Sequence, residues 1–201
     1  MTPSYLSRSA TCVVELLAKV RVVSRPVVCV FTGLPGTGKS TIADLSGRWL
    51  PAPAFAGDWL LGALKPAARV LKDLDRATMM QVYRNLLTSL VTRQLLLGQS
   101  AVVDGLATDE LLTEWRERAD SHGAAFATIE CVCSDRSVHR QRVEGRRRNI
   151  PGWHEIDWDH VERMRAEAPP LTVPHLTLDA LDALDRNTQL MKDYVREALA
   201  A

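Results

Sequence analysis

Residues 27–41 read Val-Val-Cys-Val-Phe-Thr-Gly-Leu-Pro-Gly-Thr-Gly-Lys-Ser-Thr, an apolar run that leads directly into a glycine-rich turn. The turn fits the pattern G-x-x-x-x-G-K-S/T from Gly33 to Ser40. A buried strand is predicted before it, and apolar residues at helical spacing follow it. Strand, glycine-rich turn and helix in this order are typical of a phosphate-binding loop, and no other feature constrains the fold as strongly.

The residue types in this turn suit a nucleoside triphosphate. Glycines let the backbone turn back and aim successive N–H groups at phosphate oxygens. The helix that begins near Gly38 adds the positive end of its dipole. Lys39 is expected to reach the β- and γ-phosphates, and the Ser40 hydroxyl to bind Mg²⁺. The candidate nucleotide-binding residues of this segment are Gly33, Gly36, Thr37, Gly38, Lys39, Ser40 and Thr41.

Composition limits the choice of partners and compartment. The formal net charge of +1 gives no overall field that would favour nucleic acid or a membrane. No run approaches the ~20 apolar residues that span a bilayer, and the N-terminus is unlike a signal peptide. We therefore expect a cytoplasmic protein. The four cysteines are interpreted as buried reduced thiols, because Cys131 and Cys133 lack the two further ligands of a zinc site.

Predicted strands and helices alternate along the chain. Residues 1–25 form an N-terminal extension whose apolar spacing suits a short helix, and residues 26–201 form one domain. Strands are predicted at 27–32, 54–56, 101–103, 125–133 and 175–178. Helices are predicted at 38–49, 78–97, 108–122, 135–147, 157–167 and from 185 onward, with a partly helical segment at 59–75. This alternation predicts an α/β fold of the P-loop NTPase type, with a five-stranded parallel sheet and helices on both faces.

Two aspartates follow predicted strands. Ligands of such sheets bind outside the carboxyl ends of the strands, so Gly33, Asp58 and Asp104 should share one rim. Asp104 could hold Mg²⁺ opposite Ser40, or it could cap the next helix. Asp58 could orient an acceptor hydroxyl and take its proton, or it could cap a helix that starts at Trp59. Asp104 competes with Asp58 for the role of base.

An arginine-rich segment follows the fourth strand, with arginines at 136, 140, 142, 146, 147 and 148. At about 100° per residue, Arg142 and Arg146 share one face of the predicted helix, and Arg140 lies nearly opposite. Arginines that close over a transferring phosphoryl group stabilise its charge and exclude water. Residues 135–158 are therefore a candidate lid, with Gly145 as a hinge; a solvated charged face is the alternative. Arg140 is a further candidate for contact with the nucleotide.

The acceptor side has weaker signals. Segments 59–76 and 149–158 are expected to shape its pocket. Trp59, Trp153 and Trp158 could stack on a ring-bearing acceptor or pack in the core. His154 could contribute to the pocket or lie on the surface.

With these residues in place, the chain resembles the P-loop kinases of small molecules, a group with chloramphenicol phosphotransferase-like, zeta-toxin-like and gluconate-kinase-like enzymes. The resemblance covers residues 26 to about 198. It rests on Gly33 to Thr41, Gly57-Asp58, Val-Val-Asp104, Arg142-Val-Glu-Gly-Arg146 and Leu178-Asp179. It implies that ATP and Mg²⁺ are the cofactors, that a small molecule is the acceptor, that Asp58 is the base, and that Lys39, Arg142 and Arg146 act in catalysis.

Gly57-Asp58-Trp-Leu and Arg142-Val-Glu-Gly-Arg-Arg are also similar to segments of adenylate kinases. However, this chain has Asp104-Gly-Leu-Ala-Thr after its third predicted strand, without the proline and arginine that adenylate kinases have there. Three functions stay open. A small-molecule kinase is favoured. A nucleotide or polynucleotide kinase could use Lys65, Arg69, Lys72 and Arg76, although the net charge argues against nucleic acid as a partner. A non-kinase NTPase switch is the third. The sequence indicates neither the acceptor nor the oligomeric state.

Overall fold

The computed structural model describes residues 25–67 and 73–201, and the helix expected within residues 1–25 lies outside this part. One five-stranded sheet has the order β2-β3-β1-β4-β5, with every neighbouring pair parallel. The strands are β1 (Val27–Thr32), β2 (Ala54–Ala56), β3 (Ala101–Asp104), β4 (Ala125–Val132) and β5 (Leu176–Asp179). The predicted five-stranded parallel sheet is confirmed.

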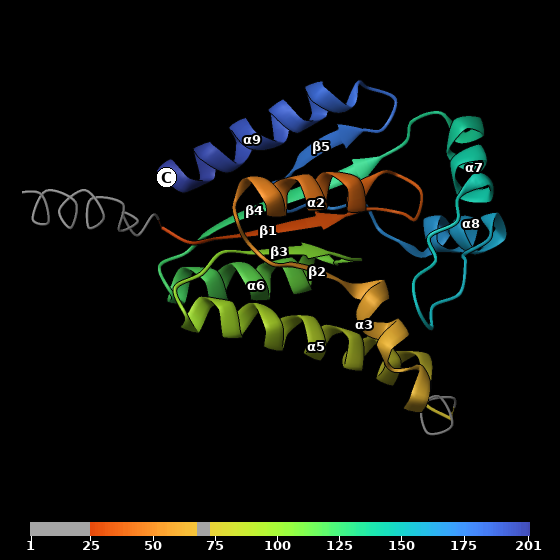
Figure 1. The fold of residues 1–201 in the computed structure, drawn as a ribbon, viewed down its shortest axis with the longest axis horizontal. Coiled ribbons are helices and arrows are strands. Elements are labelled where there is room, and N and C mark those ends of the chain that lie inside the picture. The colour runs from red at the N-terminus through yellow and green to blue at the C-terminus, as the bar shows by residue number, and fades with distance from the viewer. Residues whose placement is uncertain (1–24, 68–72) are drawn as a thin grey trace, which may run out of the picture.

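Helices cover both faces of this sheet (Figure 1). They are α2 (Lys39–Trp49), α3 (Gly57–Ala63), α5 (Arg76–Leu96), α6 (Asp109–Ser121), α7 (Arg136–Gly145), α8 (Trp158–Glu167) and α9 (Leu184–Ala200), with a short 3₁₀ turn η1 (Lys65–Ala67). Helices α2 and α9 lie on one face and α5 and α6 on the other, while α7 and α8 lie beyond the strand ends. Within the described residues, no helix has the length and apolar character needed to cross a bilayer.

Strand β1 is the centre of the core, and all six of its residues are buried. Cys29 and Phe31 belong to the cluster under α2 and α9, whereas Val28 and Val30 belong to the cluster under α5 and α6. This alternation follows from the two-residue period of a strand. Apolar side chains on both faces of the strand require helices on both faces of the sheet.

The three described cysteines, Cys29, Cys131 and Cys133, are free and buried, as expected. Burial raises the pKa of the Cys29 and Cys131 thiols to about 12, so both stay protonated at neutral pH. These residues therefore act as small apolar core residues.

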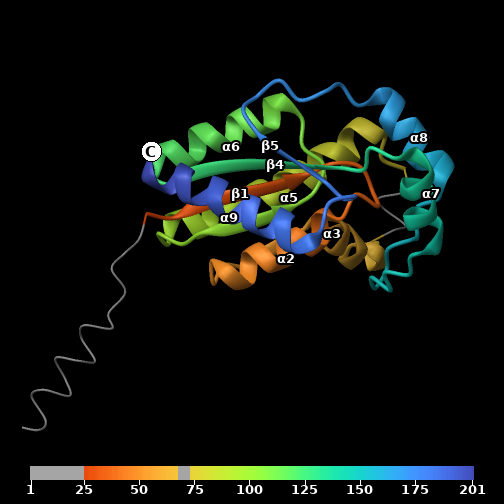
Figure 2. The same ribbon diagram turned by 90° about the horizontal axis from the view of Figure 1, so that it is seen from above.

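Parallel pairing brings the carboxyl ends of the strands to one edge. Asp104 is aligned with Phe31 of β1 and with Ala56 of β2. The glycine-rich turn after β1 and helix α3 after β2 therefore start beside the end of β3. Seen from above, α7 and α8 close this same edge, opposite the C-terminus (Figure 2).

Candidate active site

The glycine-rich turn has the backbone that its sequence predicts. Gly33, Gly36 and Gly38 have φ angles of 129°, 91° and 85°. At Gly33, a Cβ atom would overlap the carbonyl oxygen of Cys131, so only glycine fits. Helix α2 has Gly38 as its N-cap, with no capping side chain and no acidic residue in its first turn. Its N-terminal amides are therefore available to an anion.

Lys39 lies at the centre of a buried group of charges. Its side chain is buried, and its ammonium group is 3.5 Å from the carbonyl oxygen of Leu34. Burial lowers the pKa of Lys39, and the charges of Asp104 and Asp58 oppose this shift. The turn, β3 and α3 thus bring Lys39, Asp104 and Asp58 together.

Asp104 has the features of a cation ligand. Asp104 is 7 % exposed; burial raises the pKa of its carboxyl group, while the charge of Lys39 and the neighbouring Ser40 hydroxyl oppose this shift. Its Oδ1 atom has no hydrogen-bond partner among the described residues. A buried carboxylate oxygen beside a hydroxyl is a set of hard oxygen donors of the kind that Mg²⁺ prefers, so these two residues fit the cation. Asp104 does not cap the next helix, because the N-cap of α6 is Thr108.

Asp104→Asn is expected to raise the Mg²⁺ concentration for half-maximal activity by about 10- to 100-fold. The amide keeps the shape of the side chain but removes the charge that would hold the cation. Titration of activity with Mg²⁺ at saturating ATP checks this. Asp193→Asn, on the exposed surface of α9, is the control. An unchanged Mg²⁺ requirement in Asp104→Asn would exclude this residue as the ligand.

Asp58 forms an ion pair with Arg148. Helix α3 starts at Gly57 with Ala56 as its N-cap, so Asp58 lies in the first turn and caps nothing. Arg148 is one of the six arginines of the arginine-rich segment, and no separate role is predicted for it from the sequence. The helix was predicted to continue to residue 147, but α7 ends at Gly145 and Arg146 is extended. The chain after α7 therefore leaves the helix direction, and Arg148 reaches Asp58.

Arg146 lies in the same group of charges and lacks a partner. Its Nε and Nη2 atoms are buried and unpaired among the described residues. Burial lowers its pKa, as does the neighbouring charge of Arg148, while Glu155 and Asp58 oppose the shift. Buried guanidinium groups are normally hydrogen-bonded, so this one is suited to an anionic ligand.

The remaining candidate arginines lie elsewhere. Arg142 donates a hydrogen bond of 2.7 Å from Nη2 to the carbonyl oxygen of Ala180. It lines a cavity of about 310 Å³ beside Thr37, Gly38 and Thr41. Arg140 pairs with Glu144 at 2.8 Å on the exposed side of α7. Arg146 therefore lies near Asp58, and Arg142 lies near Thr37 and Gly38 of the turn. Arg140 lies away from both places, on the exposed side of α7.

The candidate lid contacts the tip of the glycine-rich turn through His139. The imidazole is 1 % exposed; its Nε2 is 2.8 Å from the Pro35 carbonyl oxygen, and its Nδ1 is 2.8 Å from Nη2 of Arg165. Since the guanidinium can only donate, Nδ1 accepts and Nε2–H donates to Pro35. A Cβ on Gly36 would lie 2.6 Å from Val143, one turn after His139. No role is predicted for His139 from the sequence, although its i, i+4 spacing to Val143 is a signal that could have indicated this buried face.

His139→Gln is expected to lower the free energy of unfolding by about 1–3 kcal/mol at pH 7.5, because buried partners lose their hydrogen bonds. Burial lowers the pKa of His139 below the ordinary value of about 6.5. The stabilisation by the neutral ring is therefore complete above pH 6.5 and is lost as the pH falls toward the lower, folded-state pKa. Urea unfolding at pH 7.5 and 5.5 should show a smaller difference between wild type and variant at pH 5.5. A difference that does not depend on pH would contradict this account.

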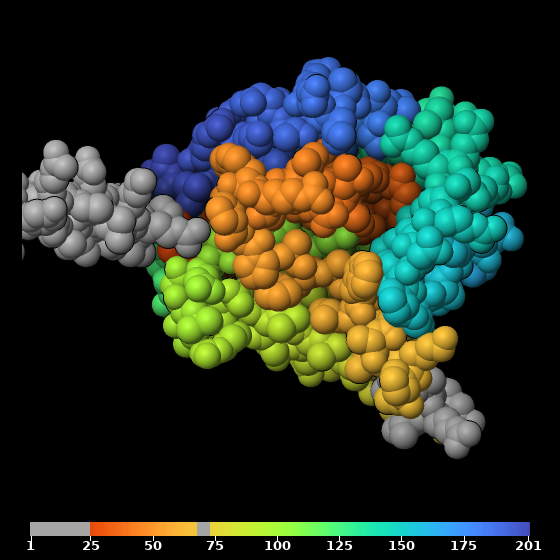
Figure 3. Space-filling view, in the orientation of Figure 1, coloured from red at the N-terminus to blue at the C-terminus, as the bar shows by residue number. Residues whose placement is uncertain are grey.

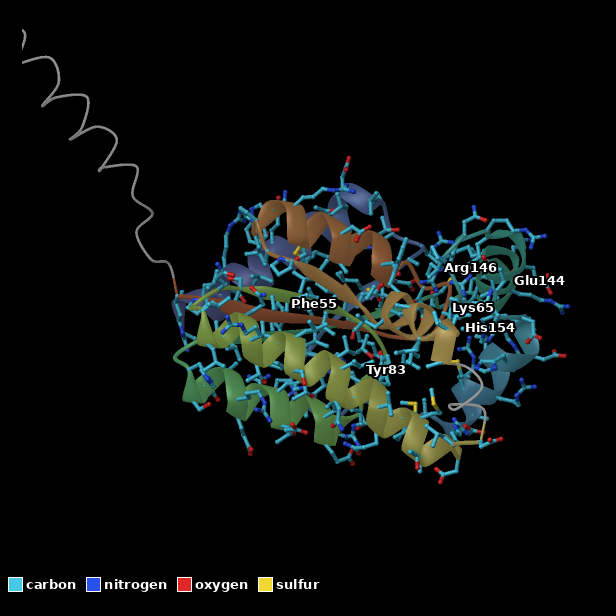
Figure 4. The ribbon with its side chains drawn as sticks, turned by 60° about the horizontal axis from the view of Figure 1, so that its bottom comes forward. Phe55, Lys65, Tyr83, Glu144, Arg146 and His154 are labelled. Carbon is cyan, nitrogen blue, oxygen red and sulfur yellow. The ribbon has the colours of Figure 1, made fainter. Side chains whose placement is uncertain are left out.

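A second, larger cavity of about 780 Å³ is lined by Lys39, which does not line the smaller cavity. Residues from α3, α5, the end of β3, the chain before α8 and α8 itself line it. Tyr83 is buried at its inner end, where the hydroxyl accepts a hydrogen bond of 2.9 Å from the Leu106 amide. Figure 4 shows Tyr83 toward the sheet, with Lys65, His154 and Arg146 on the side of the candidate lid.

The segments predicted to shape an acceptor pocket contribute to this cavity. Leu61 and Lys65 come from the first segment, and Trp153 and His154 from the second. In Figure 3 the teal surface of the candidate lid lies beside the yellow-orange surface of residues 57–67. Trp158 instead packs in the small core between α7 and α8, and Trp59 is 55 % exposed. The three tryptophans therefore have three different environments.

Solved structures share this fold. A sugar kinase from Janibacter sp. HTCC2649 is 15% identical, with a TM-score of 0.62 over 88% of this chain and 97% of that one. A gluconokinase from Sinorhizobium meliloti 1021 is 19% identical, with a TM-score of 0.56 over 90% and 92%. Kti12 from Chaetomium thermophilum, solved with ADP-AlF3, is 15% identical, with a TM-score of 0.62 over 87% and 100%. At these identities the likeness shows the fold.

Comparison with curated protein sequences found no match. A family model described as an AAA domain matches residues 28–171, which is more than half of the chain and includes the glycine-rich turn, Asp58, Asp104 and α7. The chain therefore belongs to this AAA domain family, AAA_33, and has the α/β fold of the P-loop kinases.

Proposed function

We propose that this protein is an ATP- and Mg²⁺-dependent phosphotransferase that moves the γ-phosphoryl group of ATP to a hydroxyl of a small molecule. The observation that carries the proposal is the position of Lys39, Asp58 and Asp104 at the inner end of the 780 Å³ cavity, next to the phosphate-binding loop. The smaller cavity lies along the same loop, beside Thr37 and Gly38. Two cavities that meet at one loop suit a donor and an acceptor.

On the donor side, the amides of the loop and Lys39 bind the phosphates, and the 310 Å³ cavity receives the nucleoside. Arg142 lines that cavity, so its proposed role is nucleotide contact. Ser40 and Asp104 would hold Mg²⁺, which neutralises charge on the phosphate oxygens when bound.

On the acceptor side, Asp58 accepts the proton of the attacking hydroxyl. Its ion pair with Arg148 fixes the position of the carboxylate. The unpaired N–H groups of Arg146 donate to oxygens of the transferring phosphoryl group, where negative charge must be stabilised. The candidate lid, which contacts the loop through His139, excludes water from this region.

The free thiols support a proposal for the compartment. Free, buried cysteines agree with a reducing environment in which ATP is available, and we propose the cytoplasm.

The proposal is tested by measuring ADP release from wild-type protein with a library of hydroxyl compounds, followed by mass spectrometry of each mixture. An acceptor should raise ADP release above the rate with ATP alone and should gain one phosphoryl group. Lys39→Ala is the negative control. Equal ADP release with every compound, and no phosphorylated product, would indicate an NTPase and contradict the proposal.

A further inference from the structure

The walls of the 780 Å³ cavity are apolar. Its sides carry aliphatic and thioether groups, among them Leu61, Leu64, Met79, Met80, Ile156 and Met164. Met80 is 41 % exposed, although apolar side chains of this size usually gain by burial. The cavity wall is thus a connected apolar surface formed by α3, α5 and α8.

Charged groups lie at the two ends of this cavity, and His154, His160 and Arg163 also line it. Lys39, Asp58 and Asp104 lie at the inner end, while Lys65 and the ion pair of Arg76 with Glu167 lie at the mouth. Among the described lining residues there is no serine, threonine, asparagine or glutamine. A polyhydroxylated acceptor needs a partner for each hydroxyl that it buries, since an unpaired buried hydroxyl is costly. The aliphatic and thioether groups of the walls supply none, so the available partners are limited to His154, His160, Arg163 and the groups at the two ends.

We propose that the acceptor is a hydroxyl compound with a largely apolar body, and that such compounds are preferred over polyols and sugars. This inference rests on the proposed phosphotransferase function. The acceptor hydroxyl lies beside Asp58, and the apolar body extends along the walls toward the mouth. A volume of about 780 Å³ is within the range of cavities that hold drug-sized molecules.

The methionines in the wall add a second expectation. Met79, Met80 and Met164 have flexible, polarisable side chains that adapt to ligands of different shape. The protein should therefore accept a series of related apolar alcohols and not a single compound.

Benzyl alcohol, 2-phenylethanol, 3-phenylpropanol and 4-phenylbutanol form a test series with one hydroxyl and a growing apolar body. Gluconate, glucose and glycerol form the polar series. Two quantities are measured for each compound: the dissociation constant without ATP, by saturation-transfer NMR, and the kcat/KM for phosphorylation. Each added methylene is expected to improve both by about threefold to fourfold until the cavity is filled.

Met79→Gln places an amide of similar size in the wall and should weaken 4-phenylbutanol binding by about tenfold. Leu96→Gln is the matched control, because Leu96 is at the opposite end of the same helix and is 64 % exposed. It should bind 4-phenylbutanol as the wild type does.

The two readouts separate the inference from the function on which it rests. If affinity rises along the phenylalkanol series and the compounds are phosphorylated, both stand. If affinity rises without phosphorylation, the ligand class stands and the phosphotransferase proposal fails. If the polar series is bound or phosphorylated in preference, or affinity does not change with the apolar body, the inference is overturned.

Discussion

Asp58→Asn is expected to lower kcat for phosphoryl transfer by about 100- to 10,000-fold, while the dissociation constant for ATP changes by less than about twofold. The amide cannot take the proton of the acceptor hydroxyl. ATP binding is spared because the donor cavity is lined by other residues, among them Thr37 and Gly38. Transfer is measured as phosphorylated product by mass spectrometry, and ATP binding by calorimetry.

Arg148→Gln separates loss of the base from loss of its ion pair. Asp58→Asn removes the carboxylate and leaves Arg148 unpaired, whereas Arg148→Gln leaves the carboxylate in place. If Asp58 is the base, Arg148→Gln loses less activity than Asp58→Asn. Undiminished transfer by Asp58→Asn would reject the assignment and favour Asp104 as the base.

Gly33→Ala is expected to abolish ATP binding at millimolar concentrations or to prevent folding. The φ angle of 129° is strained for any residue with a Cβ, which costs about 1–3 kcal/mol. Overlap of that Cβ with the Cys131 carbonyl oxygen adds about 1–3 kcal/mol. If the loop instead moves to relieve the overlap, ATP binding must restore the native loop. The combined cost of the φ angle and the overlap then corresponds to a loss of at least about 30-fold in ATP affinity.

Gly98→Ala is the matched control for Gly33→Ala. Gly98 also has a positive φ, 63°, but a Cβ there would contact nothing within 4 Å. It should cost about 1 kcal/mol of stability and leave ATP affinity unchanged. Thermal unfolding and calorimetry with ATP measure both effects. Wild-type ATP affinity in Gly33→Ala would show that the loop tolerates a side chain.

Most of the fold could be predicted because local and tertiary signals agree in β1 and α2. The apolar run of β1 is buried on both faces, and its glycines permit the turn that starts α2. The α7 boundary was predicted less well. Helical periodicity predicts a helix as far as residue 147, but α7 ends at Gly145 and Arg146 is extended. The chain therefore changes direction after Gly145, and Arg148 reaches Asp58.

The cavity wall could be predicted only in part, because its residues come from segments far apart in the chain. Met79 and Tyr83 have the i, i+4 spacing of a core face, which predicts burial and not a cavity wall. Helix α5 is 21 residues long, about 31 Å, whereas β3 has four residues, about 13 Å. The first turns of α5 therefore extend past the sheet and line the cavity. This part of the cavity wall could be predicted only from a comparison of the lengths of α5 and β3.

The proposed function requires that the γ-phosphoryl group of ATP is transferred to an acceptor hydroxyl. The most direct measurement uses ATP labelled with ¹⁸O in the γ-phosphoryl group, together with 4-phenylbutanol and the hydroxyl library. Mass spectrometry should find a phosphate ester that carries the labelled phosphoryl oxygens, with the ester oxygen supplied by the acceptor, and Lys39→Ala should form none. Label recovered only in inorganic phosphate, with every hydroxyl compound unchanged, would contradict the account.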